Sequence, residues 1–426
     1  RYGSGAMGGV VNIVTKKVPK EFKGQINLYA NQPQDSKEGE TRRIGFNLGG
    51  PIVQDVLGFR IYGNLNKTDA DSADINAGRS GRLVAAGVEG VRNKDIAGRL
   101  QWKISPSQTL VFDSSYSRQG NIYNGDTQNS NPPANTLALY NGLVGSKAET
   151  ARLYRSAFSL THDGAWDWGD TKNIISYERT TNSHLPEGLA GGPEGSYTGL
   201  DFVQSRLKNL RFSSEANIPF KLGVDNVLTV GAEFTDSKLD DPASNSQSLT
   251  DRIPGGPGRL PRVIVNTFPG VSEHRGGKTS QRNWAAYIED NISLTGKTHL
   301  IPALRFDHNS VSGGNWSPTL NFSQQIGENW LIKGGIARAY KAPNLYQSNP
   351  EFILYTRGLG CPLAAGGRSL SCYYMGNANL KPETSVNKEI GAEFTRNGWQ
   401  ASATYFHNAY RNKIVIGERP LAINSN

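Results

Sequence analysis

Short segments in which apolar and polar residues alternate recur along the chain and are its most regular feature. Residues 300–307 read LIPALRFD, so an extended strand would place Leu304 and Phe306 on one face and charged residues on the other. Residues 58–65 and 226–234 alternate in the same way. This period of two predicts antiparallel β-strands, each with one face that could meet lipid.

The alternation fits two classes of protein. A transmembrane strand needs only about 9–11 residues, and the strands of a soluble antiparallel sheet alternate in the same way. No run of 18 apolar residues exists, which excludes a transmembrane helix. Alternation alone therefore leaves both a membrane barrel and a soluble sheet open.

The lengths of the connections favour the barrel. Short connections are expected at 106–108, 167–170 and 296–297. Long polar ones are expected near 69–94, 124–150, 187–203, 237–277 and 349–382. Short turns on one side and long loops on the other are typical of bacterial outer-membrane barrels.

Counted in this way, about fifteen strands lie between residue 24 and the end of the chain. An odd number cannot close a bacterial single-chain barrel, and residues 421–426 are mostly polar. We therefore expect the chain to be a fragment, with closing strands missing after Asn426.

Composition and charge exclude other classes. Only 36% of the residues are apolar, and the net charge of +9 comes from 46 Lys and Arg against 37 Asp and Glu. The basic residues are spread out with no nucleic-acid motif, and the surplus suits an anionic ligand or anionic lipid headgroups. The six histidines are scattered, and no nucleophile elbow, phosphate loop or metalloprotease helix occurs. We expect neither an enzyme nor a metal site built from protein ligands.

The two cysteines, Cys361 and Cys372, lie in one long loop. In an oxidising compartment such a pair usually closes a disulfide. Two free thiols or half a zinc site are the alternatives, although zinc would need further Cys or His nearby.

Three phrases resemble motifs of TonB-dependent outer-membrane receptors. They are RAYKAPNLY at 338–346, NLKPET at 379–384 and RYGSGAMGGVVNIVTK at 1–16. Further segments are similar to the ferric-enterobactin branch of that family: 62–68, 116–121, 125–129, 185–192, 304–308 and 315–318.

The resemblance implies an all-β fold, a large antiparallel transmembrane β-barrel of 22 strands in the full protein and about 15 here. Residues 1–20 would be the C-terminal end of a plug domain, most of it missing before Arg1. Residues 21–426 would form a partial barrel with long extracellular loops.

The resemblance also implies a function. Such a receptor binds a ferric catecholate siderophore, enterobactin or a close analogue, at its extracellular loops and imports it into the periplasm with TonB-coupled energy. It holds no covalent cofactor, because iron(III) is carried only within the siderophore. Expected partners are TonB with ExbB and ExbD, through a plug segment absent from this chain, together with outer-membrane lipid and lipopolysaccharide. The expected state is a monomeric, multi-pass protein of the bacterial outer membrane. A passive porin and a secreted soluble adhesin are the alternatives.

An anionic, aromatic siderophore calls for Arg or Lys to balance its charge and for aromatic or guanidinium faces to stack on it. Arg357 is the first candidate, because relatives carry a basic residue at the matching place before the Gly-Cys pair. Leu359 stands where several relatives have Gln, which leaves the preferred catecholate open. Arg275 matches another family arginine more loosely. The remaining candidates are Arg368, Tyr355, Tyr373 and Tyr374.

Overall fold

The structure is a computed structural model. The residues described are 3–4, 15–72, 74–75, 87–124, 142–143, 145–186, 200–242, 250–253, 262–265, 275–357 and 371–415, with only the backbone in 250–253, 262–265, 354–357 and 371–374. Among these residues, one antiparallel sheet of fifteen strands dominates. Its strands are β1 (Lys23–Asn31), β2 (Thr41–Val53), β3 (Leu57–Thr68), β4 (Gly90–Ser105), β5 (Gln108–Ile122), β6 (Ala151–Trp166), β7 (Gly169–His184), β8 (Val203–Leu222), β9 (Val224–Asp240), β12 (Lys278–Thr295), β13 (Thr298–Asn309), β14 (Gly313–Ile326), β15 (Trp330–Lys341), β18 (Glu383–Arg396) and β19 (Trp399–Arg411).

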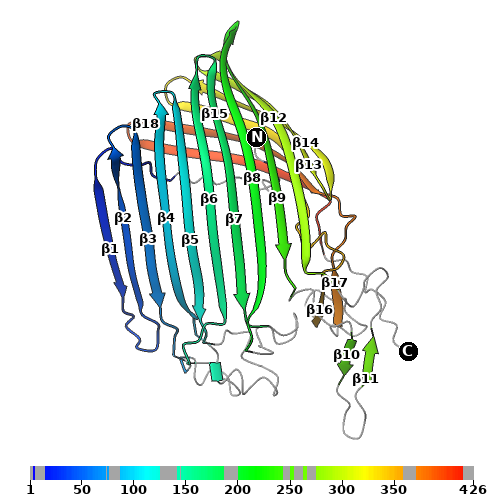
Figure 1. The fold of residues 1–426 in the computed structure, drawn as a ribbon. Coiled ribbons are helices and arrows are strands. Elements are labelled where there is room, and N and C mark those ends of the chain that lie inside the picture. Colours follow the sequence, from blue (N-terminus) through cyan, green and yellow to red (C-terminus); the bar gives the residue numbers. More distant parts are fainter. Residues whose placement is uncertain are drawn as a thin grey trace.

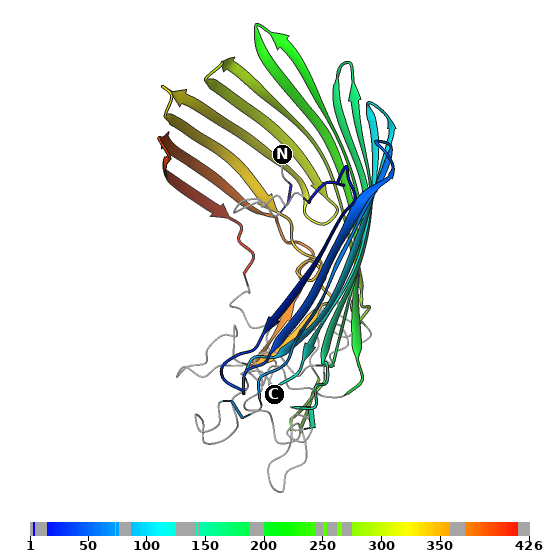
Figure 2. The same cartoon turned by 90° about the vertical axis from the view of Figure 1, so that its left-hand side faces the viewer.

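Each strand of this sheet pairs with the strands before and after it, from β1 at one edge to β19 at the other. Two short hairpins interrupt the sequence of strands: β10 (Thr250–Ile253) with β11 (Arg262–Val265), and β16 (Ile353–Arg357) with β17 (Ser371–Met375). Figure 1 shows both hairpins at the end of the sheet that carries the long connections. Figure 2 shows the sheet curved into a trough, with the described N-terminal residues on its concave side.

The predicted number of strands and their alternation are confirmed. Two predicted loops are shorter than expected, because β4 already begins at Gly90 and β9 continues to Asp240. The sequence pattern does not predict the tight connection between β13 and β14, which lies on the side of the long loops. There Asn309 Oδ1 accepts hydrogen bonds from Val311 N at 3.0 Å and Ser312 N at 3.1 Å, which closes the turn locally.

The two faces of the sheet differ in chemistry. Gly3 lies against Arg305 on the concave side, which we call the lumen face; strand alternation and register assign the other residues. On β14, the outer-face residues Trp316 and Leu320 are 55% and 43% exposed, whereas the lumen-face residue Asn315 is 5% exposed. A continuous apolar outer face with a polar interior is the arrangement of a barrel wall in lipid.

Aromatic side chains gather on the outer face toward both ends of the strands. The rings of Trp284 and Phe306 are 5.3 Å apart, and those of Phe306 and Trp316 are 4.7 Å apart. Near the short turns, the rings of Trp330 and Phe394 are 4.9 Å apart. Two such aromatic zones are expected where a barrel wall meets the two membrane surfaces. In the described part of the chain, no helix is long and apolar enough to cross a membrane.

Candidate functional site

The connection after β9 and the connection after β15 are joined at their bases on the side of the long loops. The Tyr346 hydroxyl donates to Asp241 Oδ2 at 2.6 Å, and Gly276 N donates to Glu351 Oε2 at 3.2 Å. Burial, followed by the hydrogen bond to the carboxylate, raises the pKa of Tyr346, so its hydroxyl stays a donor over the physiological range. These contacts connect two loops that are distant in sequence.

The hairpin of β16 and β17 rises from this base. Ile353, its first residue, is 1% exposed, and Gly376 N donates to Phe352 O at 3.1 Å where the hairpin ends. The register pairs Tyr355 with Tyr373 and Arg357 with Ser371. The candidate residues of this segment therefore stand on neighbouring positions of one small sheet.

The predicted site residues fall into three groups. Tyr355, Arg357, Tyr373, Tyr374 and Cys372 lie on this hairpin, where only the backbone is described. The other two residues of that segment, Arg368 and Cys361, lie outside the described residues, so the Cys361–Cys372 disulfide stays a prediction.

The third group is Arg275, which lies at the base of the joined loops. Burial lowers the pKa of its guanidinium, and the nearby Glu351 carboxylate opposes that shift. Since Glu351 also accepts a hydrogen bond from Gly276 and lies just before β16, the structure brings the Arg275 segment to the root of the hairpin. Arg275 and the candidate residues of the hairpin, which are far apart in sequence, thus lie in one region of the structure.

Below these loops the lumen holds a polar chamber of about 810 Å³. Residues from β7, β8, β9, β12 and β13 line it together with Gly3 and Ser4; they include Ser176, Glu178, Asn209, Arg211, Glu233, Gln281, Asn283 and Arg305. Hydroxyl, amide and charged groups dominate this lining, so the chamber suits a hydrated polar solute rather than an apolar ligand.

A buried ion-pair network forms one wall of this chamber. Arg305 is 3% exposed and donates to Asp307 through Nε and Nη2, both at 2.9 Å, and to Glu233 Oε2 at 3.0 Å. Arg211 donates to Glu233 Oε1 at 3.2 Å, and the Arg305 guanidinium lies 5.4 Å from the centre of the Tyr287 ring. Arg305 and Asp307 are held rigidly, because both side chains are shielded from water and each has a charged partner.

The network touches the N-terminal segment. A Cβ atom on Gly3 would lie only 2.6 Å from Arg305 Nη2, so glycine permits this close approach. Beside it, Ala342 N donates to Ser4 Oγ at 2.9 Å. The alternation of residues 300–307 places Arg305 and Asp307 on one strand face, but it predicts no role for them; their spacing of two residues is the available signal.

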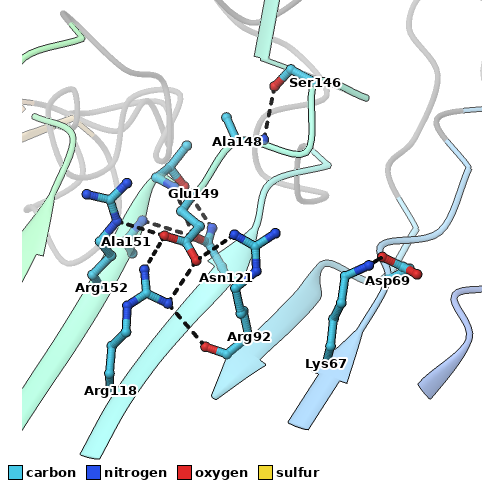
Figure 3. A network of polar contacts seen from close by, with 11 residues as sticks. Lys67, Asp69, Arg92, Arg118, Asn121, Ser146, Ala148, Glu149, Ala151 and Arg152 are labelled. Carbon is cyan, nitrogen blue, oxygen red and sulfur yellow. Dashed lines mark hydrogen bonds and ion pairs between the residues drawn. The ribbon is translucent and has the colours of Figure 1, made fainter. Parts of the chain in front are cut away.

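A second polar cluster lies near the long loops (Figure 3), and the register of β4 to β6 places its arginines on the outer face. We call it the Glu149 cluster: Glu149 with Arg92, Arg118 and Arg152, from the ends of β4, β5 and β6. Glu149 Oε1 accepts from Arg118 Nη1 at 2.9 Å and from Arg92 Nη1 at 3.3 Å, and Oε2 accepts from Arg152 Nε at 2.8 Å. Burial would raise the pKa of the Glu149 carboxyl, but hydrogen bonds from Arg118 and Arg152 outweigh it and lower that pKa. The cluster keeps an excess of positive charge.

Both clusters are built from ion pairs. The carboxylates of both are already paired with arginine, and within the described residues no three His, Cys, Asp or Glu side chains could hold a metal ion together. What the geometry defines is a membrane-embedded β-barrel wall with a polar lumen, an N-terminal segment fixed inside it, and long loops gathered at one end.

Comparison with known proteins places this wall in a family. The family described as "TonB dependent receptor-like, beta-barrel" matches residues 95–425, and the chain belongs to it. It is accordingly a β-barrel chain of the bacterial outer membrane.

Similar proteins are transport receptors. The chain is 49% identical over 424 residues to the ferric enterobactin receptor PirA of Pseudomonas aeruginosa, covering 97% of this chain and 54% of that protein. It is 47% identical over 429 residues to the ferrienterobactin receptor of Escherichia coli K12, covering 98% and 55%. The chain thus spans about half the length of these relatives.

Solved structures agree. The siderophore receptor PirA from Acinetobacter baumannii superposes with a TM-score of 0.86 at 45% identity, covering 99% of this chain and 57% of that one. An arginine-to-alanine mutant of the ferric enterobactin receptor PfeA from P. aeruginosa, in complex with enterobactin, superposes with a TM-score of 0.87 at 46% identity, covering 99% and 58%.

Proposed function

We propose that this protein is an outer-membrane receptor that binds a ferric catecholate siderophore, enterobactin or a close analogue, at its extracellular loops. It would import the complex into the periplasm with TonB-coupled energy. The observation that carries the proposal is the near-complete match of the chain to ferric enterobactin receptors at 47–49% identity. A passive porin finds no support among these relatives.

The ligand would be recognised from the outside. Iron(III) stays within the siderophore, so the protein supplies arginines and aromatic rings rather than metal ligands, with no covalently bound cofactor. Arg357, Arg275, Arg368, Tyr355, Tyr373 and Tyr374 are the proposed contacts. Their support is that the hairpin and the Arg275 segment meet at one root beside the joined loops. Electrostatic attraction would raise the encounter rate with the anionic complex.

Coupling to TonB would run through the N-terminal side of the chain. We assign residues 1–20 to the end of a plug domain and residues 21–426 to part of a barrel of 22 strands. The contacts of Gly3 and Ser4 with the lumen wall support this division. TonB with ExbB and ExbD, surrounding lipid and lipopolysaccharide, and a monomeric state complete the proposal.

The direct test is a tryptophan-fluorescence titration of the full-length protein in detergent. Saturable quenching by ferric enterobactin, with no response to a ferric hydroxamate siderophore, is expected for a catecholate receptor. An equal response to both, or to neither, would overturn the ligand assignment and leave only the barrel.

Arg357 can be tested in the same titration. Arg357→Ala should weaken binding by about 1.5–3 kcal/mol, the range for a hydrogen bond to a charged group. Arg396→Ala, at the short-turn end of β18, removes the same charge far from the loops and should bind like the wild type. If both variants bind like the wild type, Arg357 is not a contact.

A further inference from the structure

The connection between β15 and β16 is a compact block that is hydrogen-bonded to itself. We call it the root block and define it as residues 342–352. Asn344 Oδ1 accepts hydrogen bonds from Tyr346 N at 3.0 Å and from Gln347 N at 2.8 Å. Ser348 Oγ donates to Asn344 O at 2.9 Å. Because one asparagine closes these turns locally, the shape of the root block is set within the block itself.

The β16–β17 hairpin leaves this block and returns to it. Ile353 follows the block directly, begins β16 and is 1% exposed. After β17, Asn377 N donates to Gln347 O at 2.7 Å. A Cβ atom on Gly376 would overlap Asn349 O, so glycine permits the returning chain to lie against the block. The orientation of the hairpin therefore follows the orientation of the root block.

Tyr346 joins the root block to the ends of two strands of the wall. Its hydroxyl donates to Asp241 Oδ2 at 2.6 Å. Asp241 directly follows β9, is 5% exposed, and donates its amide to Gly277 O at 2.7 Å, directly before β12. The contact between Gly276 N and Glu351 Oε2 joins the same parts of the chain at 3.2 Å but is exposed. A hydrogen bond to a carboxylate shielded from water is the stronger of the two, so Tyr346 makes the main connection.

We propose that Tyr346 is a positioning residue for siderophore binding: through Asp241 it holds the β16–β17 hairpin in the orientation that binds the ferric catecholate. The Tyr346 hydroxyl is occupied by Asp241, and its ring lies 4.9 Å from the ring of Phe352, the last residue before the hairpin. The proposal rests on the receptor function proposed above and adds a residue that is not a ligand contact. If the hairpin is not held, only the fraction of molecules with the hairpin in place can bind, and the apparent affinity falls by that fraction.

The test is the binding of ferric enterobactin to the full-length Tyr346→Phe variant, which loses only the hydroxyl and keeps the ring beside Phe352. Stopped-flow tryptophan fluorescence measures both rates. Binding should be about 10-fold weaker than in the wild type. The loss should lie in the association rate, because the bound hairpin keeps all its contacts with the siderophore. An unchanged affinity, or a loss that lies in the dissociation rate as for a direct contact, would overturn the proposal.

The partner of Tyr346 provides a second variant. Asp241→Ala should cause the same loss, and the double variant should lose no more than either single variant, because both side chains act through one hydrogen bond. Additive losses, or tighter binding to Asp241→Ala because its carboxylate only repels the anionic complex, would overturn the proposal. The matched control is Tyr116→Phe, which removes a 44% exposed tyrosine's hydroxyl from the outer face of β5 and should bind like the wild type. An equal loss in this control would also contradict a role specific to Tyr346.

Hydrogen exchange without ligand tests the positioning separately from the proposed function. Gly276 N donates to Glu351 of the root block and should lose protection in Tyr346→Phe. The amides of Gln347, which bonds within the block, and of Asp241, which bonds on the wall, should keep their protection. Unchanged exchange at Gly276, or lost protection at Gln347, would overturn the proposal. If the wild type fails to bind ferric enterobactin, the receptor function fails, while these amides still decide whether Tyr346 holds the root block.

Discussion

The charge that matters most at the scale of single residues is buried. Arg305 satisfies both Asp307 and Glu233. Arg305→Ala leaves the buried Asp307 carboxylate without its arginine and Glu233 with Arg211 alone, and it should lower the free energy of unfolding by about 3–5 kcal/mol. The more exposed Arg211→Ala should cost at most about 1 kcal/mol. Unfolding by guanidinium chloride in detergent measures both changes in free energy. Equal losses in the two variants would show that burial of the ion pair is unimportant.

The contribution of the Glu149 side chain to stability depends on pH. Because its folded pKa is lowered, its contribution to stability is fully present above the usual glutamate pKa and is lost as the pH falls through the folded pKa. The amides of Thr150 and Ala151 both donate to Asn121 Oδ1 at 2.9 Å and report on this segment. Their hydrogen-exchange protection, corrected for intrinsic rates, should decrease only in strong acid.

Glu149→Gln provides the comparison. With the carboxylate gone, protection of the same two amides should already be lower at neutral pH and should lack the decrease in acid. A wild-type decrease at or above the usual glutamate pKa would contradict the lowered pKa.

At the scale of the element, a strand of this wall meets lipid on one side and water-filled space on the other. Leu160 of β6 faces outward and is 42% exposed, whereas its neighbour Ser159 faces the lumen. Leu160→Arg should destabilise the barrel by about 2–4 kcal/mol if it lies near the middle of the bilayer, and Ser159→Arg should cost much less. The fraction refolded into lipid vesicles, read by the gel shift of the folded form, distinguishes them. A larger defect in Ser159→Arg would reverse the assignment of the faces.

The strands and their faces were the features best predicted from the sequence. Alternation identified the strands around Leu304 and Ile61 and sorted their faces correctly, since a lipid-facing side must be apolar in every strand. Loop bounds were less accurate, because the residues of β4 and β9 nearest the loops are mostly polar and resemble loop residues. The tight turn after Asn309 was missed because its hydrogen bonds are made by a single side chain.

At the scale of the whole molecule, one contact joins residues 338 positions apart: Ala342 N donates to Ser4 Oγ. Gly3→Ala would force its new Cβ against Arg305, which is held by Asp307, and should loosen the N-terminal segment from the lumen wall. Conductance of the full-length protein in planar bilayers should increase. Gly45→Ala, whose Cβ would have ordinary contacts at 3.7 Å or more, should conduct like the wild type. Equal conductance in the two variants would contradict an N-terminal segment that is held against the wall at Gly3.

The sequence by itself determined the period of the strands, the side of the long loops and the family, because these depend on local patterns and short motifs. Only the tertiary structure decided which charges meet. Arg305 reaches Glu233, the Arg275 segment reaches the root of the β16–β17 hairpin, and Arg179 stands opposite Lys208. Such contacts follow from the register between strands that are far apart in the chain, and a shift by one residue would move every side chain to the other face.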